Sequence, residues 1–402
     1  MKKNDSGAGV KGAALFLTPA SPYPAVGGGA LRTASLLEYL AQHYTVDTII
    51  FREPGAEDPA RALPGGLVRE AYVINLSYHA KHALARVARN AGRLLRRVPP
   101  LVDRFAGYGE QVASFLQGRD YELSIVNQFW CAPYWEQLAP RSRRTIIDLQ
   151  NVESVLHAQH AEIETGPVAF AHHIFYTAAR ELEGRWLPRF SSVLIPSEEG
   201  AGEVQAISPG SRVIVYPNAI PRVPQPRRRE QDEIVFSGNL EYHPNISGVR
   251  FFRREIWPLL RKEWPTLVWR LIGKNPHAVR KYTDGDARIE VSGPVQNAIE
   301  ELAAAKVAVV PLLSGSGTRL KIIEAWAAGR PVVSTRLGAE GLPARHGENI
   351  LLADDAENFA GAVSALLNSP SLRAKIGQRG RKTFEQQLTW EAAWRRLDSS
   401  GI

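Results

Sequence analysis

Residues 314–321 read Ser-Gly-Ser-Gly-Thr-Arg-Leu-Lys, a combination of residue types that can hold an anion. An apolar run that ends at Pro311 predicts a strand before this segment, and the apolar periodicity after Arg319 predicts a helix. The unpaired N–H groups at the start of such a helix, together with the Ser/Gly loop, favour a bound phosphate. Arg319 and Lys321 would oppose the helix dipole unless an anion lay there, so they strengthen this prediction.

A carboxylate follows the two cations. Glu324 comes three positions after Lys321, so the two side chains share one face of the predicted helix. An ionised carboxylate only accepts hydrogen bonds and suits a pair of hydroxyls on a ribose or another sugar. The segment therefore predicts a site for phosphate and sugar; the alternative is an ordinary glycine-rich helix start with surface charges.

The rest of the chain must position this site, and along it short apolar runs alternate with stretches of helical periodicity. The first run is followed by a Pro/Gly loop, PASPYPAVGGG, and by a helix with regularly spaced leucines. Such alternation is typical of doubly wound parallel sheets, so the predicted fold class is α/β. The predicted strands are 13–18, 46–51, 123–126, 145–149 and 193–195 in the first half, and 234–237, 268–272, 289–291, 307–310, 332–334 and 350–352 in the second.

A Pro/Arg-rich segment separates the halves. Residues 219–229 read AIPRVPQPRRR, with three prolines, four arginines and few bulky apolar side chains. We therefore expect a first domain at 1–217, a linker at 218–230, a second domain at 231–388 and a C-terminal helix at 389–402.

Composition excludes several classes of protein. The 402 residues are 44% hydrophobic and 22% charged, as in ordinary globular chains, with a net charge of +8 that weakly favours anionic partners. The single cysteine, Cys131, excludes an internal disulfide and a cysteine-based zinc site. No histidine pair has metal-ligand spacing with a third ligand, so no metal is expected. No run reaches the length of a signal or spanning segment, which predicts a cytoplasmic protein.

One segment is strongly basic. Residues 79–98 carry six Lys and Arg residues and no acid, and their apolar residues recur at helical spacing. Three interpretations stay open: a solvated arginine face over a stripe packed in the core, an anionic membrane surface at the inner face of the membrane, or nucleic acid. The aromatic residues form no basic–aromatic cluster, so nucleic acid is not expected as a partner. The basic residues are Lys81, Arg86, Arg89, Arg93, Arg96 and Arg97, and the apolar ones Leu84, Val87, Ala91, Leu94 and Leu95.

From Phe236 to Trp390 the sequence resembles the nucleotide-sugar domain of retaining GT-B fold glycosyltransferases of the "glycosyl transferases group 1" type. The matching pieces are FSGNLEYHPNISGVRFF, LIGKNP, VSGPV, VVPLLSGSGTRLKIIEAWAAGRPVVST, GAEGL and NILLADD. The first half is similar through PYPAVGGGALRT, IIDLQNVES and VYPNAI. The resemblance implies two Rossmann-like domains facing across a cleft, with the activated sugar mainly on the second domain and the acceptor on the first.

The resemblance also implies roles for single residues. Arg319, Lys321 and Gln150 are expected to be catalytic, Glu324 to hold the ribose, and Val295 to flank the base. Arg32 is expected to contact the acceptor. The remaining donor-binding residues would be Gly27, Gly28, Gly29, Asn239, Lys274, Gly315, Ser316, Gly317, Thr318 and Leu320.

Three departures from the family pattern change the expected chemistry. Ser316 stands where members usually carry a Glu, and Asn239 and Asn245 replace an Arg and a Lys. Neutralisation of the phosphate charge must therefore depend more heavily on Arg319 and Lys321. Gln150 stands where a His often faces the reacting sugar; it can donate a hydrogen bond but does not titrate. Because such transfer depends on stabilising charge on the departing diphosphate, this loss is expected to cost less than it would in a hydrolase.

The expected function is that of an enzyme, a hexosyltransferase-like glycosyltransferase. It would move a sugar, with retention, from a nucleotide-diphospho-sugar to a glycan or lipid-linked acceptor in polysaccharide or glycolipid biosynthesis. The nucleotide sugar is a substrate, and no cofactor is expected. One alternative is a nucleotide-sugar epimerase of the same fold, although no obvious cluster of histidines or carboxylates serves its acid–base steps. The other is a catalytically impaired GT-B binding subunit, which Gln150 and Ser316 favour.

Overall fold

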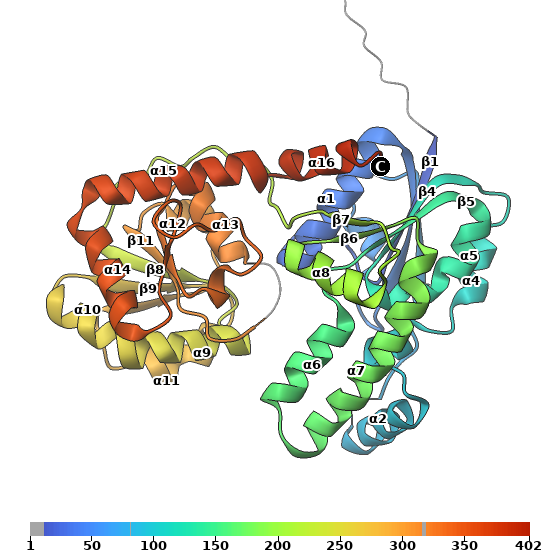
Figure 1. Ribbon diagram of the computed structural model, residues 1–402, viewed down its shortest axis with the longest axis horizontal. Helices are drawn as coiled ribbons and strands as arrows, with labels where there is room; N and C mark the ends of the chain where they lie inside the picture. The colour runs from blue at the N-terminus through green and yellow to red at the C-terminus, as the bar shows by residue number, and fades with distance from the viewer. Residues whose placement is uncertain (1–11, 81, 316–318) are drawn as a thin grey trace, which may run out of the picture. The chain divides into compact units, whose positions relative to one another are not determined.

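The computed structural model describes residues 12–80, 82–315 and 319–402 (Figure 1). The predicted site residues Ser316, Gly317 and Thr318 lie outside these ranges. The chain divides into two compact units, one made of Met1–Pro217 with Arg396–Ile402 and the other of Asn218–Arg395. Within the described ranges, none of the helices combines the length and apolar character needed to cross a membrane.

Unit 1 contains a parallel sheet of seven strands in the order β3-β2-β1-β4-β5-β6-β7. The chain winds outward from β1 in one direction and from β4 in the other, so the sheet reverses between these strands. Residues 14–17 of β1 are fully buried, and strands buried on both faces require helices on both sides. The strands are β1 Ala13–Thr18, β2 Thr45–Arg52, β3 Glu70–Asn75, β4 Tyr121–Asn127, β5 Ser142–Asp148, β6 Ser192–Ile195 and β7 Val213–Val215.

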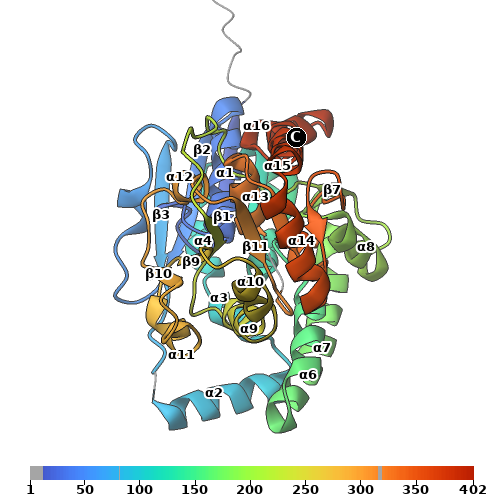
Figure 2. The same cartoon turned by 90° about the vertical axis from the view of Figure 1, so that its left-hand side faces the viewer.

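The helices of unit 1 include a long pair, α6 and α7, that pack side by side, and α2 contacts α7 near the tip of that pair (Figures 1 and 2). The helices are α1 Gly28–His43, α2 Ala83–Arg96, α3 Pro100–Phe105, α4 Gly109–Phe115, α5 Trp135–Leu138, α6 Glu153–Ile163, α7 Gly166–Trp186 and α8 Glu198–Ile207.

Unit 2 contains a parallel sheet of six strands in the order β10-β9-β8-β11-β12-β13, which reverses between β8 and β11. Its core holds three fully buried tryptophans, Trp257, Trp269 and Trp326. The strands are β8 Glu233–Ser237, β9 Val268–Ile272, β10 Ile289–Ser292, β11 Val307–Val310, β12 Val332–Ser334 and β13 Leu351–Leu352. The helices are α9 His243–Phe251, α10 Trp257–Glu263, α11 Arg280–Thr283, α12 Ala298–Leu302, α13 Leu320–Ala327, α14 Ala356–Asn368, α15 Pro370–Gln387 and α16 Trp390–Ser399, the last of which runs into unit 1.

The prediction of two parallel α/β domains is confirmed. The analysis of the sequence missed β3 and β7, which form the two edges of the first sheet. Edge strands keep partly exposed positions, as the pattern of β3 shows, so they lack the continuous apolar runs of the central strands. The segment 218–230, expected as a linker, groups with unit 2.

Candidate functional site

Arg319 lies at the start of α13, at the carboxyl edge of the unit 2 sheet. Its Nη2 donates to the carbonyl oxygen of Gly315 at 2.9 Å and to Glu340 Oε2 at 3.1 Å. The side chain is only 6% exposed, and within the described ranges its Nε has no hydrogen-bond partner. Because a buried N–H group without a partner is costly, this guanidinium is suited to donate to an anion.

Lys321, in the first turn of α13, is the second cation of the site. Its Nζ donates to Asn245 Oδ1 at 3.0 Å and lies 5.4 Å from the centroid of the Phe236 ring. Burial lowers the pKa of Lys321 to about 8, and the nearby charge of Arg319 acts in the same direction. A bound anion would offset both effects, so these two cations favour a ligand with negative charge.

Glu324 lies one turn further along α13. Burial raises the pKa of its carboxyl to about 7, and the charge of Lys321 opposes this rise. The two cations and this carboxyl therefore lie in one partly desolvated site, where their protonation states depend on one another.

The first turn of α9, which follows β8, holds Lys321 in place through Asn245. Asn245 is buried and donates through Nδ2 to the carbonyl oxygen of Asn239 at 2.7 Å, while its Oδ1 accepts from the lysine. The ends of β8 and β9 approach so closely that a Cβ on Gly273 would lie 1.6 Å from the carbonyl oxygen of Gly238. Asn245 stands at one of the two positions where the resemblance leads us to expect an Arg or a Lys. Instead of supplying a charge, it orients Lys321 by accepting its hydrogen bond.

The other predicted donor-binding residues of unit 2 are spread along the same edge. Leu320 and Val295 are half-buried, and Lys274 and Asn239 are exposed after their strands. A Cβ on Gly315 would lie 2.8 Å from Pro244, which explains why a glycine fits there. Contacts of these side chains with a nucleotide stay predictions.

Arg32 of unit 1 is not positioned to meet an acceptor. It is 1% exposed and forms an ion pair with the buried Asp148 at 2.6 Å. It also donates to the carbonyl oxygen of Tyr216, and Asn127 Nδ2 donates to Asp148 at 2.8 Å. Reaching an acceptor would require breaking this buried pair, so we assign Arg32 a positioning role instead of the expected acceptor contact.

Gln150 packs against the glycine loop that begins α1. Its Nε2 donates to the carbonyl oxygen of Gly29 at 3.3 Å and to Thr33 Oγ1 at 3.4 Å. A Cβ on Gly29 would lie 2.7 Å from Gln150 Oε1, so a larger residue there would displace the end of the glutamine side chain. Gly27 precedes the helix with a φ of 93°, and Gly28 is its first residue. The structure brings Gln150 and Gly29 together; a role of either in catalysis or donor binding stays a prediction.

Histidines gather where α6 and α7 pack. The Nδ1 atoms of His157 and His172 are 3.0 Å apart, and His160 stacks on His172. Burial lowers the pKa of His157 to about 4, so it is neutral at physiological pH. In the part of the chain that the structure describes, no group of three or more potential ligand side chains could hold a metal ion.

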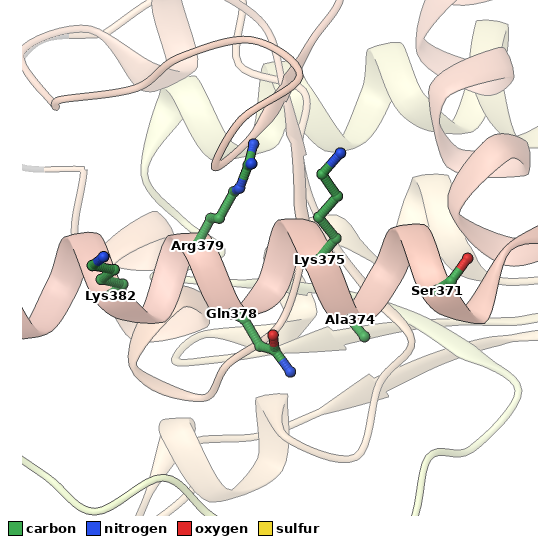
Figure 3. A pocket seen from close by; sticks show the side chains of 6 residues that line it. All are labelled: Ser371, Ala374, Lys375, Gln378, Arg379 and Lys382. Carbon is green, nitrogen blue, oxygen red and sulfur yellow. The ribbon is translucent and has the colours of Figure 1, made fainter.

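A separate hollow of about 500 Å³ lies along one side of α15 (Figure 3). Its lining includes three exposed cations, Lys375, Arg379 and Lys382, and no carboxylate. It does not include any residue of the site around α13.

The sequence analysis missed two residues of these sites. Asp148 ends an apolar strand and gave no sign of its partner Arg32, which is distant in the sequence. Glu340 belongs to the GAEGL segment, but only the fold shows that it reaches Arg319.

Comparisons with known proteins agree with this geometry. Residues 231–369 match the family described as "Glycosyl transferases group 1". The lipopolysaccharide core biosynthesis glycosyltransferase LpsE of Rhizobium meliloti is 44% identical over 73 residues, which cover 18% of this chain and 22% of that protein. Among the curated relatives that match, the aligned part covers 18–35% of their length.

Solved structures match the whole chain. Sucrose-phosphate synthase from Thermosynechococcus elongatus aligns with a TM-score of 0.71 and 17% identity over 97% of this chain and 98% of that one. Anabaena Alr3699/HepE in complex with UDP aligns with a TM-score of 0.65 and 14% identity, over 96% of this chain and 99% of that one. The predicted two-domain GT-B fold is therefore confirmed, and the family resemblance is confirmed over residues 231–369.

Proposed function

We propose that this chain, whose residues 231–369 form a group 1 glycosyl transferase domain on a GT-B fold, is a glycosyltransferase that uses a nucleotide-diphospho-sugar. The acceptor would be a glycan or a lipid-linked glycan in polysaccharide or glycolipid assembly. The relative LpsE, named for lipopolysaccharide core biosynthesis, supports this class of pathway. The nucleotide sugar enters the proposal as a substrate, not as a resident cofactor.

The observation that carries the proposal is the sequence of charges along α13. Arg319 and Lys321 are two partly desolvated cations at a helix start, and Glu324 is an acceptor one turn beyond them. A nucleoside diphosphate presents two phosphates followed by a ribose, the complementary order. HepE, a protein of the same fold, was solved in complex with UDP, which supports a nucleotide as the ligand.

In the proposed reaction, the bond between the anomeric carbon and the diphosphate oxygen breaks, and the acceptor hydroxyl oxygen bonds to that carbon on the same face. The hydroxyl proton moves to the departing diphosphate. Arg319, Lys321 and the start of α13 stabilise the negative charge that develops on the leaving group. This route needs no protein nucleophile and no titrating group at Gln150.

The Glu324→Gln variant tests the ribose contact. We expect its affinity for UDP to fall by about 1.5–3 kcal/mol, because a hydrogen bond to a charged acceptor is lost. Affinity for free pyrophosphate should be nearly unchanged, since pyrophosphate has no ribose. Calorimetric titration measures both, at a pH between the pKa values of about 7 for Glu324 and about 8 for Lys321. Equal losses for the two ligands would place Glu324 elsewhere in the site.

Turnover separates the proposed transferase from its alternatives. A transferase releases the nucleoside diphosphate and forms a new glycoside when an acceptor is present. An epimerase of the same fold would change the sugar without an acceptor, and an impaired subunit would bind the nucleotide sugar with neither outcome. Incubation of labelled nucleotide sugars with purified protein and a lipid extract distinguishes the three.

We also propose that α2 binds an anionic membrane surface. Its outward face is apolar, with Leu84, Val87 and Leu95 exposed by 81%, 65% and 86%. On the opposite face, Arg93 is buried and Arg96 is exposed, and both form ion pairs with Asp103 of α3 at 2.8 Å. The interpretation of a stripe packed in the core is therefore wrong. The exposed stripe would enter the interface, and the exposed Arg86 and Arg97 would meet lipid phosphates.

Replacing the stripe tests this proposal. We expect Leu84→Glu with Leu95→Glu to abolish co-sedimentation with vesicles containing phosphatidylglycerol, because each buried leucine contributes about 1.5–3 kcal/mol. Leu259→Glu, at an exposed leucine of α10, is the control and should leave sedimentation unchanged. Equally weak sedimentation with neutral and anionic vesicles would contradict the proposal.

A further inference from the structure

Glu340 follows a short turn, Leu337–Ala339, that lies directly on the carboxyl ends of two strands of unit 2. The N–H of Gly338 donates to Thr335 Oγ1 at 2.9 Å. A Cβ on Gly338 would lie 2.5 Å from Ser334 Oγ and 2.9 Å from the carbonyl oxygen of Val310, so the turn packs closely on the ends of β12 and β11. The backbone that carries Glu340 is therefore fixed beside the site.

The carboxylate of Glu340 is held on one side and open on the other. Its Oε2 accepts from Arg319 Nη2 at 3.1 Å, whereas the side chain as a whole is 59% exposed. Part of this carboxylate is therefore accessible beside the buried guanidinium of Arg319. The exposed part of this carboxylate can accept further hydrogen bonds from a ligand that already contacts Arg319.

The four charged side chains of the site follow the order of groups in a nucleotide sugar. Glu324 and Lys321 are one turn apart on α13, and Arg319 lies before the helix. Glu340 reaches Arg319 from a different loop, so the two cations have an acceptor at each end. The ligand has ribose hydroxyls, two phosphates and sugar hydroxyls in the same order. If the ribose lies at Glu324, the sugar lies at Glu340.

We propose that Glu340 accepts hydrogen bonds from the hydroxyls of the transferred sugar and thereby helps to determine which sugar is used. The inference rests on the proposed function, because it requires a diphosphate at Arg319 and Lys321. It also accounts for Ser316, which offers no carboxylate at the position where the family usually has one.

The test compares nucleotide sugars with their nucleoside diphosphates. Calorimetry is run with UDP-glucose, UDP-galactose and UDP-N-acetylglucosamine beside UDP, and with GDP-mannose beside GDP. Each nucleotide sugar and its nucleoside diphosphate form a pair. The variants are then compared with the pair in which the sugar increases the affinity of the wild-type protein most. In Glu340→Gln, affinity for the nucleotide sugar should fall about tenfold or more while that for the diphosphate stays within about twofold.

Glu348→Gln is the matched control, because Glu348 is 57% exposed and pairs with Arg345 at 3.7 Å in the same unit. It should change neither affinity. Equal losses for both ligands in Glu340→Gln would overturn the inference and leave Glu340 as a positioning residue for Arg319. Unchanged binding of both ligands would overturn it as well, as would a wild-type protein that gains no affinity from any of the sugars. Absence of binding by UDP and GDP would instead refute the proposed function.

Discussion

Asp148→Asn is expected to lower the free energy of unfolding of unit 1 by about 3–5 kcal/mol, because it removes the counter-charge of a buried arginine. Arg32 is 1% exposed, and Asp148 is fully buried. An asparagine oxygen or a backbone carbonyl can accept a hydrogen bond from the guanidinium, but neither carries a full charge. Hydrogen exchange in peptides of unit 1, compared with peptides of unit 2, measures the loss within the intact chain.

Two controls distinguish this cost from a general effect of removing a carboxylate. Glu122→Gln breaks the exposed pair with Arg143 at 3.3 Å and should cost about 1 kcal/mol or less. Arg32→Met combined with Asp148→Leu removes both charges and should recover much of the lost stability. If Asp148→Asn costs no more than Glu122→Gln, the pair does not stabilise unit 1 as we infer.

The same ion pair shows where prediction from sequence ended. The strand 13–18 was predicted with its observed bounds, because a strand buried on both faces is a continuous apolar run. Arg32 was predicted as an acceptor contact because its position on α1 gives no sign of a partner at the end of β5. A contact between residues so distant in sequence depends on strand order, which periodicity does not reveal.

The donor site was predictable to the extent that it is local. Arg319, Lys321 and Glu324 are neighbours on one helix start, so their spacing alone indicated a shared site. Asn245 and Glu340 join them from other strand ends, and only the fold shows the contacts that they make. The basic helix shows the converse error: its amphipathic pattern was correct, but Arg93 is buried against Asp103 of α3 and the apolar stripe is exposed.

Lys321→Met is expected to weaken UDP binding by about 1.5–3 kcal/mol at pH 7, because a desolvated charge-assisted hydrogen bond to phosphate is lost. The wild-type protein should also lose affinity as the pH rises above the lysine pKa of about 8, since the neutral amine no longer attracts the diphosphate. Below the Glu324 pKa of about 7, affinity should fall again because the protonated carboxyl accepts ribose hydroxyls poorly. In Lys321→Met the alkaline decline should disappear and the acidic one should remain. Lys262→Met, at an exposed lysine of α10, should keep both.

The same substitution should stabilise the unliganded protein. The pKa of Lys321 is lower in the folded chain than in the unfolded one, so below about pH 8 the folded state holds a charge that burial disfavours. Each unit of depression costs about 1.4 kcal/mol, and partial solvent access reduces this, so a gain of about 1–3 kcal/mol is expected at pH 7. Between the folded and unfolded pKa values the unfolded chain binds more protons, so wild-type stability rises with pH and the gain shrinks. Chemical denaturation of both proteins across this range measures it. A Lys321→Met variant that loses UDP binding without gaining stability would mean that the lysine is well solvated in the unliganded protein, and that its charge is not held there for an anion.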